Sequence, residues 1–254
     1  MQSVDFFMMS GQSNMQGQSE GPPEPPPKLL DGVSAWEYHY LSGTLIPVAH
    51  PSGEDIIRNG EALLLGAHQG FGGLLPDFAS AYAHASGHNA CYAHCAKGAT
   101  TMAEWQKGTA RFACAVEKAL GALKLLEKEE YSVQNACLVW LQGESDGIIN
   151  TGKDEYARLL LRFWQDLKKE VPLKKFLIIR VGYFHHFPCE PIMQAQEKLC
   201  QTQPDFHMIS RLASTFTVEN GLMQGETAPY HYTNRGYAVI GADAGKNAAL
   251  LLKN

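Results

Sequence analysis

The segment FFMMSGQSN, residues 6–14, is an apolar run that stops abruptly at small and polar residues. Consecutive apolar residues are typical of a parallel strand that is covered on both faces of its sheet. Gly11 permits a tight turn after such a strand, so Ser13 would be exposed just beyond the end of the sheet. These residues alone leave two interpretations of Ser13, a nucleophile that a base could reach or the N-cap of a helix.

Similar short apolar runs alternate along the chain with helical patterns. Apolar residues recur near the 3.6-residue period in two long segments, which predicts helices there, and Pro172 ends the second pattern. The alternation predicts an α/β fold with a parallel sheet, and the length allows one large domain over residues 1–254. Strands are expected at 4–9, 90–94, 136–141, 176–181 and 207–209, and helices at 77–85, 109–129, 156–167 and 234–252.

The composition excludes several classes of protein. The net charge of -5 argues against a broad surface for nucleic acid or an anionic membrane. The first nine residues, MQSVDFFMM, carry no basic residue and too short an apolar run for a signal peptide, so we expect a cytoplasmic protein with reduced cysteines. Cys91, His94 and Cys95 lack a second group of ligands at suitable spacing, so no metal site is expected.

Two stretches are expected to form loops. GPPEPPPK, residues 21–28, cannot form a helix or a central strand because of its prolines, and a surface loop is the simplest interpretation. The glycine-rich stretch from Asp31 to Gly73 is expected to be irregular. In open α/β sheets such loops cover sites at the carboxyl ends of the strands.

Polar residues follow two of the other expected strands. In HCAKGATTMAEW, residues 94–105, Gly98 would let the backbone approach a ligand closely and donate its N–H, although an ordinary strand-to-helix turn is equally compatible. In VWLQGESD, residues 139–146, the Gln142 amide can donate two hydrogen bonds. Glu144 and Asp146 could be general acids or bases, but anchors for loop N–H groups are the favoured interpretation.

His231 lies in APYHYTNRGY, residues 228–237, before the final helix, for which Thr233 or Asn234 could supply the cap. Its imidazole could take the proton of Ser13. His185 and His186 follow another expected strand and are either rival candidates for the base or residues of the substrate pocket. A serine, hydrogen-bond donors and a histidine at the strand ends of one sheet are the groups that acyl transfer requires.

Four blocks occur in a fixed order: GQSNM at 11–15, KGATTMAEW at 97–105, QGESD at 142–146 and HYTNRGY at 231–237. They resemble the SGNH hydrolases and, more narrowly, the sialate O-acetylesterase and acetylxylan esterase-like group of carbohydrate esterases. The resemblance extends from Phe6 to the final helix. It implies a flavodoxin-like, three-layer α/β/α sandwich with a five-stranded parallel sheet, in agreement with the five expected strands.

The resemblance assigns the nucleophile to Ser13 and the base to His231. It implies an oxyanion hole made of the N–H groups of Ser13 and Gly98 and the side-chain amide of Gln142, with no metal or organic cofactor. Family members often carry an aspartate three residues before the histidine, where this chain has Ala228. Glu226 is the candidate to orient the imidazole instead; another carboxylate or a backbone carbonyl is the alternative.

The function expected from this resemblance is that of a serine esterase. It would remove O-acetyl groups from a small sugar, either an acetylated xylan fragment or a sialic acid type of substrate, through an acyl-enzyme. The alternative, motivated by Ala228, is a carbohydrate-binding protein on an esterase fold that has lost catalysis. No contact with the sugar is assigned to the aromatic residues near the strand ends, which are Trp105, Tyr183, Phe184, Tyr230 and Tyr232.

Overall fold

The computed structural model describes residues 2–68, 71–183, 189–225 and 229–253. The elements follow one another as β1 (Gln2–Gly11), α1 (Ser13–Gln16), β2 (Ala35–His39), β3 (Thr44–Pro47), β4 (Ile56–Arg58), β5 (Glu61–Leu64), α2 (Leu75–Ser86), β6 (Ala90–Ala96), the 3₁₀ helix η1 (Met102–Trp105), α3 (Ala110–Lys128), β7 (Tyr131–Leu141), α4 (Glu144–Ile148), α5 (Lys153–Glu170), β8 (Lys175–Ile179), α6 (Glu190–Thr202), β9 (Phe206–Ser210), the 3₁₀ helix η2 (Leu212–Thr215) and α7 (Asn234–Leu252).

The main sheet of the described chain has seven strands in the order β3-β2-β6-β1-β7-β8-β9. All neighbours in it pair in parallel except β2 and β3, which are antiparallel. The five strands expected from the sequence are β6, β1, β7, β8 and β9, and their order is that of the flavodoxin-like sheet. In such a sheet the strand order reverses beside β1, at the topological switch point, and ligands bind there at the carboxyl ends of the strands.

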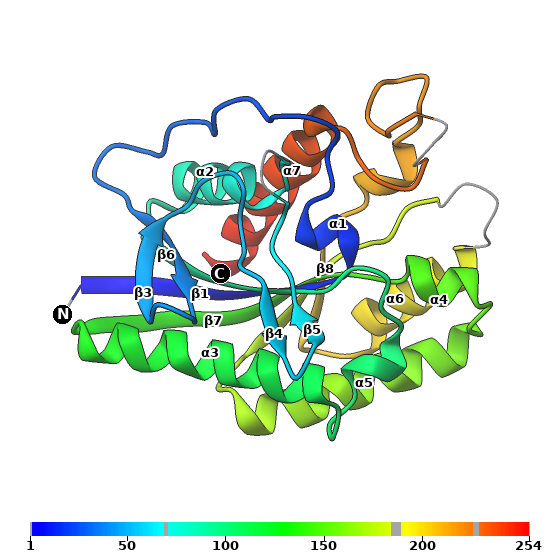
Figure 1. The fold of residues 1–254 in the computed structure, drawn as a ribbon, viewed down its shortest axis with the longest axis horizontal. Helices are drawn as coiled ribbons and strands as arrows, with labels where there is room; N and C mark the ends of the chain where they lie inside the picture. Colours follow the sequence, from blue (N-terminus) through cyan, green and yellow to red (C-terminus); the bar gives the residue numbers. More distant parts are fainter. Residues whose placement is uncertain (1, 69–70, 184–188, 226–228, 254) are drawn as a thin grey trace.

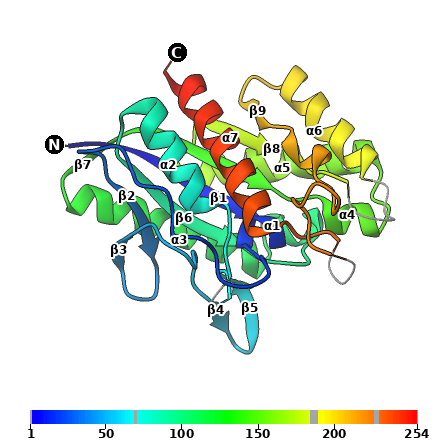
Figure 2. The ribbon, with the colours of Figure 1, turned by 90° about the horizontal axis from the view of Figure 1, so that it is seen from above.

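The sheet lies between two layers of helices, which confirms the predicted α/β/α sandwich (Figures 1 and 2). Helices α2 and α7 cover one face and pack extensively on each other, whereas α3, α5 and α6 cover the other face. The alternation of side chains along β1 explains its continuous apolar run. Phe6 and Met8 enter the core under α3 and α5, and Phe7 and Met9 enter the core under α2 and α7.

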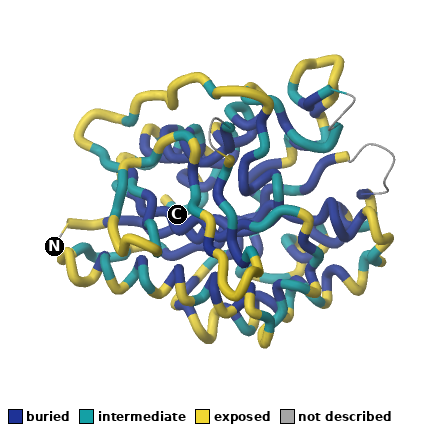
Figure 3. Tube along the Cα trace, in the orientation of Figure 1, coloured by how far each residue is buried: buried dark blue, intermediate teal, exposed yellow. Residues whose placement is uncertain are grey.

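The stretch from Asp31 to Gly73 is more ordered than expected. It contains β2 and β3, which extend the main sheet, and the separate hairpin of β4 and β5. The prediction of irregular structure was wrong there because both strands are short, at five and four residues; β2 is broken by polar side chains, and β3 ends in a proline. The proline-rich stretch before β2 lacks helix and strand, as predicted, and most of its residues are exposed (Figure 3).

Gly11 ends β1 and sets the direction in which the chain leaves the sheet. Its φ angle is 148°, and a Cβ atom at this position would lie 2.0 Å from the carbonyl oxygen of Leu141 in β7. Only glycine fits such a close approach of two backbones. The turn that presents Ser13 therefore depends on this residue.

No helix in the described ranges is both long and apolar enough to cross a membrane.

Candidate active site

Ser13, Gly98 and His231 line one cavity of roughly 480 Å³. Ser13 follows β1 and Gly98 follows β6, the strand beside it, while His231 precedes α7. Three residues from distant parts of the chain thus meet at the carboxyl end of the sheet, where the resemblance places a site. The other described lining residues are Gln12, Gln16, Gln18, Leu65, His68, Lys97, Ala99, Ser145, Ile148 and Tyr230.

Ser13 is the first residue of α1 and not its N-cap. The N-cap is Gln12, whose side chain forms no capping bond. The N-cap interpretation of Ser13 is therefore wrong, and its hydroxyl makes no hydrogen bond with another described residue. A hydroxyl in this position is open to the cavity and to a reacting group within it.

Gly98 lies against Ser13, because a Cβ atom built on Gly98 would be 3.4 Å from the Ser13 Cβ. Its N–H donates to the Oε1 atom of Gln16 at 3.0 Å, and the Gln16 amide in turn donates to the carbonyl oxygen of Gly66 at 2.9 Å. An oxyanion would have to share the Gly98 N–H with Gln16. The structure therefore brings Gly98 to the predicted place and gives its N–H a partner there.

Gln142 is fully buried, and both of its amide protons are donated within the protein. The Nε2 atom donates to the carbonyl oxygen of Thr100 at 2.8 Å and to Oδ2 of Asp146 at 2.6 Å, while Oε1 accepts a bond from the Tyr156 hydroxyl at 3.0 Å. Gln142 is not among the described residues that line the cavity. Its assignment to the oxyanion hole stays a prediction, which in this geometry would require one of these bonds to break.

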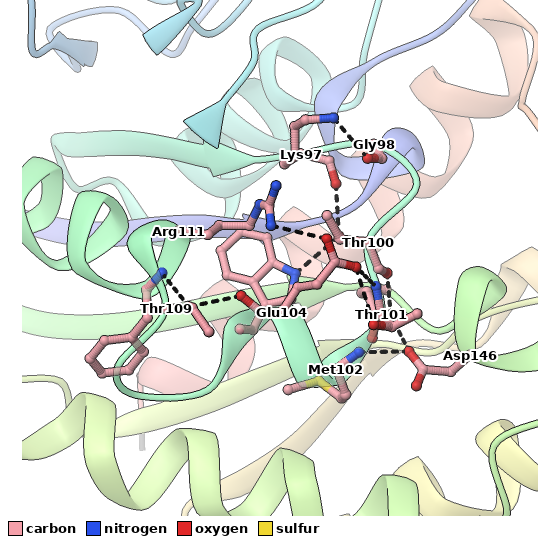
Figure 4. Close-up of polar contacts among 12 residues, drawn as sticks. Lys97, Gly98, Thr100, Thr101, Met102, Glu104, Thr109, Arg111 and Asp146 are labelled. Atoms are coloured by element: carbon pink, nitrogen blue, oxygen red, sulfur yellow. Dashed lines mark hydrogen bonds and ion pairs between the residues drawn. The ribbon is translucent and has the colours of Figure 1, made fainter. Parts of the chain in front are cut away.

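Asp146 connects the turn after β7 with the loop that carries Gly98. Its Oδ2 atom accepts the N–H of Met102 at 2.9 Å (Figure 4). The same atom accepts the Gln142 amide, and Oδ1 accepts the Thr151 hydroxyl at 3.0 Å. All of these bonds are of the kind expected from a structural anchor. Burial raises the pKa of Asp146.

The segment after Gly98 is also held by its own side chains (Figure 4). Thr101 and Glu104 form a capping box at the start of η1, and Glu104 forms an ion pair of 3.1 Å with Arg111. Trp105, which is buried, donates to the Thr100 hydroxyl at 3.0 Å. These bonds fix the path of the chain beside Ser13.

Asn14 joins the turn of the nucleophile to the turn of the histidine. Its Nδ2 atom donates to Oε1 of Glu144 at 2.8 Å and to the carbonyl oxygen of Tyr230 at 2.9 Å, and its Oδ1 atom accepts the Tyr237 hydroxyl at 2.9 Å. Asn14 and Glu144 are both buried, and burial raises the pKa of Glu144. The sequence places Asn14 in the block GQSNM, but its spacing gives the residue no separate role. A buried amide beside the nucleophile has no periodicity by which it could be found.

His231 has fewer supports. Burial lowers the pKa of its imidazole to about 4, and no described carboxylate forms a hydrogen bond or an ion pair with the ring. Its ring packs edge-on against Tyr230, with ring centroids 4.6 Å apart, and its carbonyl oxygen accepts the N–H of Gln224. Because of its lowered pKa, the imidazole is neutral above about pH 4. Of the two residues predicted to cap α7, Thr233 is the cap, and its side chain accepts the N–H of Gly236.

Ser13 and His231 share the cavity without a direct hydrogen bond, a looseness that is common before a substrate binds. The residues proposed to orient or replace His231 in the sequence analysis, Glu226, His185 and His186, lie outside the described residues. Ala228 lies outside them as well.

Lys97 carries a positive charge on the cavity wall. Among the described lining residues there is no other lysine, no arginine, no aspartate and no glutamate. The Lys97 ammonium group donates to the Gly98 carbonyl oxygen at 3.2 Å. Burial, and then the nearby Arg111, lower its pKa. The motif analysis gave Lys97 no role, since one lysine in a loop has no spacing signal.

Of the aromatic residues near the strand ends, Tyr230 lines the cavity. Trp105 and Tyr232 are buried in the core, and Tyr183 is exposed without lining the cavity. Phe184 lies outside the described residues.

A family model described as carbohydrate esterase, sialic acid-specific acetylesterase matches residues 3–249. Among solved structures, a protein from Arabidopsis thaliana superposes with a TM-score of 0.69 at 19% identity, covering 97% of this chain and 98% of that chain. NanS superposes with a TM-score of 0.65 at 14% identity, covering 98% and 97%. A carbohydrate acetylesterase from Xanthomonas citri gives 0.51 at 14% identity, covering 93% of this chain and 54% of that chain.

At such low identity these structures show that the fold is shared. No curated protein matches the sequence significantly. The family model spans nearly all of the chain, and residues from all four sequence blocks line the cavity described above. The protein therefore belongs to the carbohydrate esterase, sialic acid-specific acetylesterase family and is a carboxylic ester hydrolase.

Proposed function

We propose that the protein is a serine esterase that removes an O-acetyl group from a sugar through an acyl-enzyme. The observation that carries this proposal is that Ser13 and His231, from opposite ends of the chain, line the same cavity. A hydroxyl without a hydrogen-bond partner among the described residues and an imidazole that is neutral at physiological pH are the required nucleophile and base.

In the proposed reaction, the Ser13 oxygen attacks the acetyl carbonyl carbon while His231 takes the hydroxyl proton. The negative charge that forms on the carbonyl oxygen is stabilised by the N–H groups of Ser13 and Gly98, with Gln142 as the third donor that the resemblance assigns. His231 then protonates the departing sugar oxygen. Water, activated by the same histidine, releases acetate from Ser13.

His231 would work without a charged partner from the described residues, so its imidazolium is stabilised less than in a triad. The family pattern supplies an acid where this chain has Ala228. Glu226 remains the proposed substitute. If it fails to reach the ring, the site acts as a Ser–His dyad, which still catalyses the reaction at a lower rate.

Lys97 supports the sialic acid type of substrate over the neutral xylan fragment. The described wall around this ammonium group has no aspartate or glutamate, so the group would attract a sugar carboxylate, and such a charged hydrogen bond is worth about 1.5–3 kcal/mol. We expect Lys97→Met to lower kcat/KM for an O-acetylated sialic acid by about 10-fold or more, and to change that for an acetylated xylo-oligosaccharide by less than about 3-fold. Equal losses for both substrates would remove this choice.

The nucleophile is tested by labelling the active protein with a fluorophosphonate and locating the adduct by mass spectrometry. We expect one label per chain, on Ser13, and none in Ser13→Ala, which also loses hydrolysis of p-nitrophenyl acetate. The matched control is Ser145→Ala, because Ser145 lines the same cavity and its variant should still be labelled on Ser13. A Ser13→Ala variant that keeps the parent rate would overturn the serine mechanism, whereas absence of both labelling and hydrolysis in the parent would favour the sugar-binding alternative.

A further inference from the structure

Gln12 is a cavity residue that the mechanism has not used. It directly precedes Ser13 and is 3% exposed. Its Oε1 atom accepts two backbone N–H groups from the turn after β7, that of Gly143 at 3.3 Å and that of Ser145 at 3.2 Å. Both partners are donors, so the atom that faces them is the amide oxygen and the orientation of the Gln12 side chain is fixed.

The amide nitrogen of Gln12 must then lie on the opposite side of the group. It donates to no other described residue. Several polar side-chain atoms of the described residues are buried without a hydrogen-bond partner, and the Gln12 nitrogen is not one of them. The Nε2 atom is therefore open to the cavity that Ser13 and Gly98 line. A side-chain amide held in place by two backbone bonds, with its protons free, is a preorganised donor.

Gln12 and Gln142 are in opposite situations. The Gln142 nitrogen faces two protein acceptors, Thr100 and Asp146, and the residue is sealed from the cavity. Gln12 uses only its oxygen for structure. Of the two glutamines, Gln12 can donate to a substrate without breaking a bond.

We propose that the side-chain amide of Gln12 donates a hydrogen bond to the oxyanion of the tetrahedral intermediate, in the place that the family resemblance gives to Gln142. This inference rests on the proposed function of Ser13. It makes Gln12 a catalytic residue and gives Gln142 the separate task of tying the turn after β7 to the loop of Thr100.

Gln12→Glu tests the proposal, because a carboxylate keeps an oxygen for Gly143 and Ser145 and removes only the donor. We expect kcat for p-nitrophenyl acetate to fall by about 10²–10³-fold with KM changed by less than about 3-fold. The rate of inactivation by a fluorophosphonate should fall by a similar factor. The thermal midpoint should change little, since both backbone bonds remain.

The pH profile distinguishes a donor from a purely structural residue. The carboxyl group that Gln12→Glu introduces can donate again once it is protonated, so the loss relative to the parent should shrink as pH is lowered from about 8 to about 5, where the His231 base is still neutral. The comparison variant is Gln142→Glu, which places a second carboxylate against Asp146. We expect its main effect to be a lowered thermal midpoint.

Ser13→Ala separates failure of this inference from failure of the proposed function. If Ser13→Ala is inactive and Gln12→Glu keeps kcat within about 3-fold of the parent, the Gln12 assignment is wrong and the serine mechanism stands. A pH-independent loss in Gln12→Glu with a lowered midpoint would also overturn the assignment. If Ser13→Ala is fully active, both proposals fall.

Discussion

The two sides of the cavity are built differently. On the side of the nucleophile, short turns leave adjacent parallel strands, and buried Asn14, Gln142 and Asp146 join these turns by hydrogen bonds. On the other side, His231 lies on a loop before α7, and its ring has no carboxylate partner in the described chain. Asn14 connects the two sides, because it donates to the carbonyl oxygen of Tyr230 and accepts the hydroxyl of Tyr237 in α7.

This difference separates two requirements of the reaction. Oxyanion donors must be in place before charge develops, because their benefit comes from preorganisation. A base needs only to reach the hydroxyl proton in the reactive complex, and a looser position in the free enzyme is tolerable. We therefore expect changes on the nucleophile side to act through stability and kcat together, and changes around His231 to act through pH dependence.

The largest effect is expected where the nucleophile side is most crowded. Gly11→Ala would place a Cβ atom 2.0 Å from the Leu141 carbonyl oxygen at a φ angle of 148°. Relief of that overlap requires β1 and β7 to separate, and we expect a loss of about 4 kcal/mol or more in the free energy of unfolding, measured in urea. Gly87→Ala is the control, since its φ is 75° but the space around it is open. Equal losses in the two variants would mean that crowding is unimportant at Gly11.

Breaking the connection between the sides comes next. Asn14→Ala removes three hydrogen bonds and leaves a buried carboxylate and carbonyl without this donor, so we expect a loss of about 2–4 kcal/mol in unfolding free energy and at least about a 10-fold loss in kcat/KM. Asn247→Ala is the matched control, because its amide donates to Ile209 and Asp243 away from the cavity. It should lose stability and keep its activity. An Asn14→Ala enzyme with the parent kcat/KM would show that the two sides do not depend on this contact.

The pH dependence sharpens the comparison on the His231 side. Its pKa is lowered to about 4, so kcat/KM of the parent should rise with pH along an acid limb near pH 4. The unfolded chain, with an ordinary histidine pKa near 6.5, binds the proton more readily, so stability is lost as pH falls from about 6.5 towards 4.

Ala228→Asp restores an acid at the position that is usual in the family. The resemblance implies that a carboxylate at this position orients the imidazole. Such a carboxylate would favour the imidazolium, shift the acid limb of the profile upward by about one pH unit and raise kcat/KM by about 10-fold. The measurement is kcat/KM for p-nitrophenyl acetate between about pH 3.5 and 8, with Ala228→Asn as the uncharged control. A parent limb at about pH 6.5, or an Asn variant that matches the Asp variant, would contradict this account of His231.

The sequence predicted the five strands from their apolar runs, which in β1, β6, β7 and β8 are largely buried, and a polar turn follows each of β1, β6 and β7. It failed for β2 and β3, which are only five and four residues long; β2 alternates apolar with polar residues, and β3 ends in a proline at the edge of the sheet. Pattern identifies strands with a sustained apolar run better than strands of a few residues, because a short run carries little periodic signal.

For the site, the four ordered sequence blocks were enough to predict that Ser13, Gly98 and His231 lie together, and they line one cavity. The blocks could not separate Gln12 from Gln142. Both are glutamines at strand ends, and only three-dimensional geometry shows which amide has its protons occupied. The bond partners of a side chain depend on side-chain direction and on contacts between distant residues, neither of which residue spacing encodes.

The smallest effect is expected at Ala99, which is next to Gly98 and has a φ angle of 56°. A residue with a Cβ atom is strained in this left-handed conformation by about 1–2 kcal/mol, and glycine relieves the strain at some cost in chain entropy. We expect Ala99→Gly to raise unfolding free energy by about 0.5–1 kcal/mol and to lower kcat by less than about 3-fold, because the turn beside Ser13 becomes freer. Glu130→Gly, at a φ of 59° in the turn between α3 and β7, should gain similar stability with no change in kcat. If Ala99→Gly instead raises kcat, a rigid turn beside Ser13 does not favour catalysis.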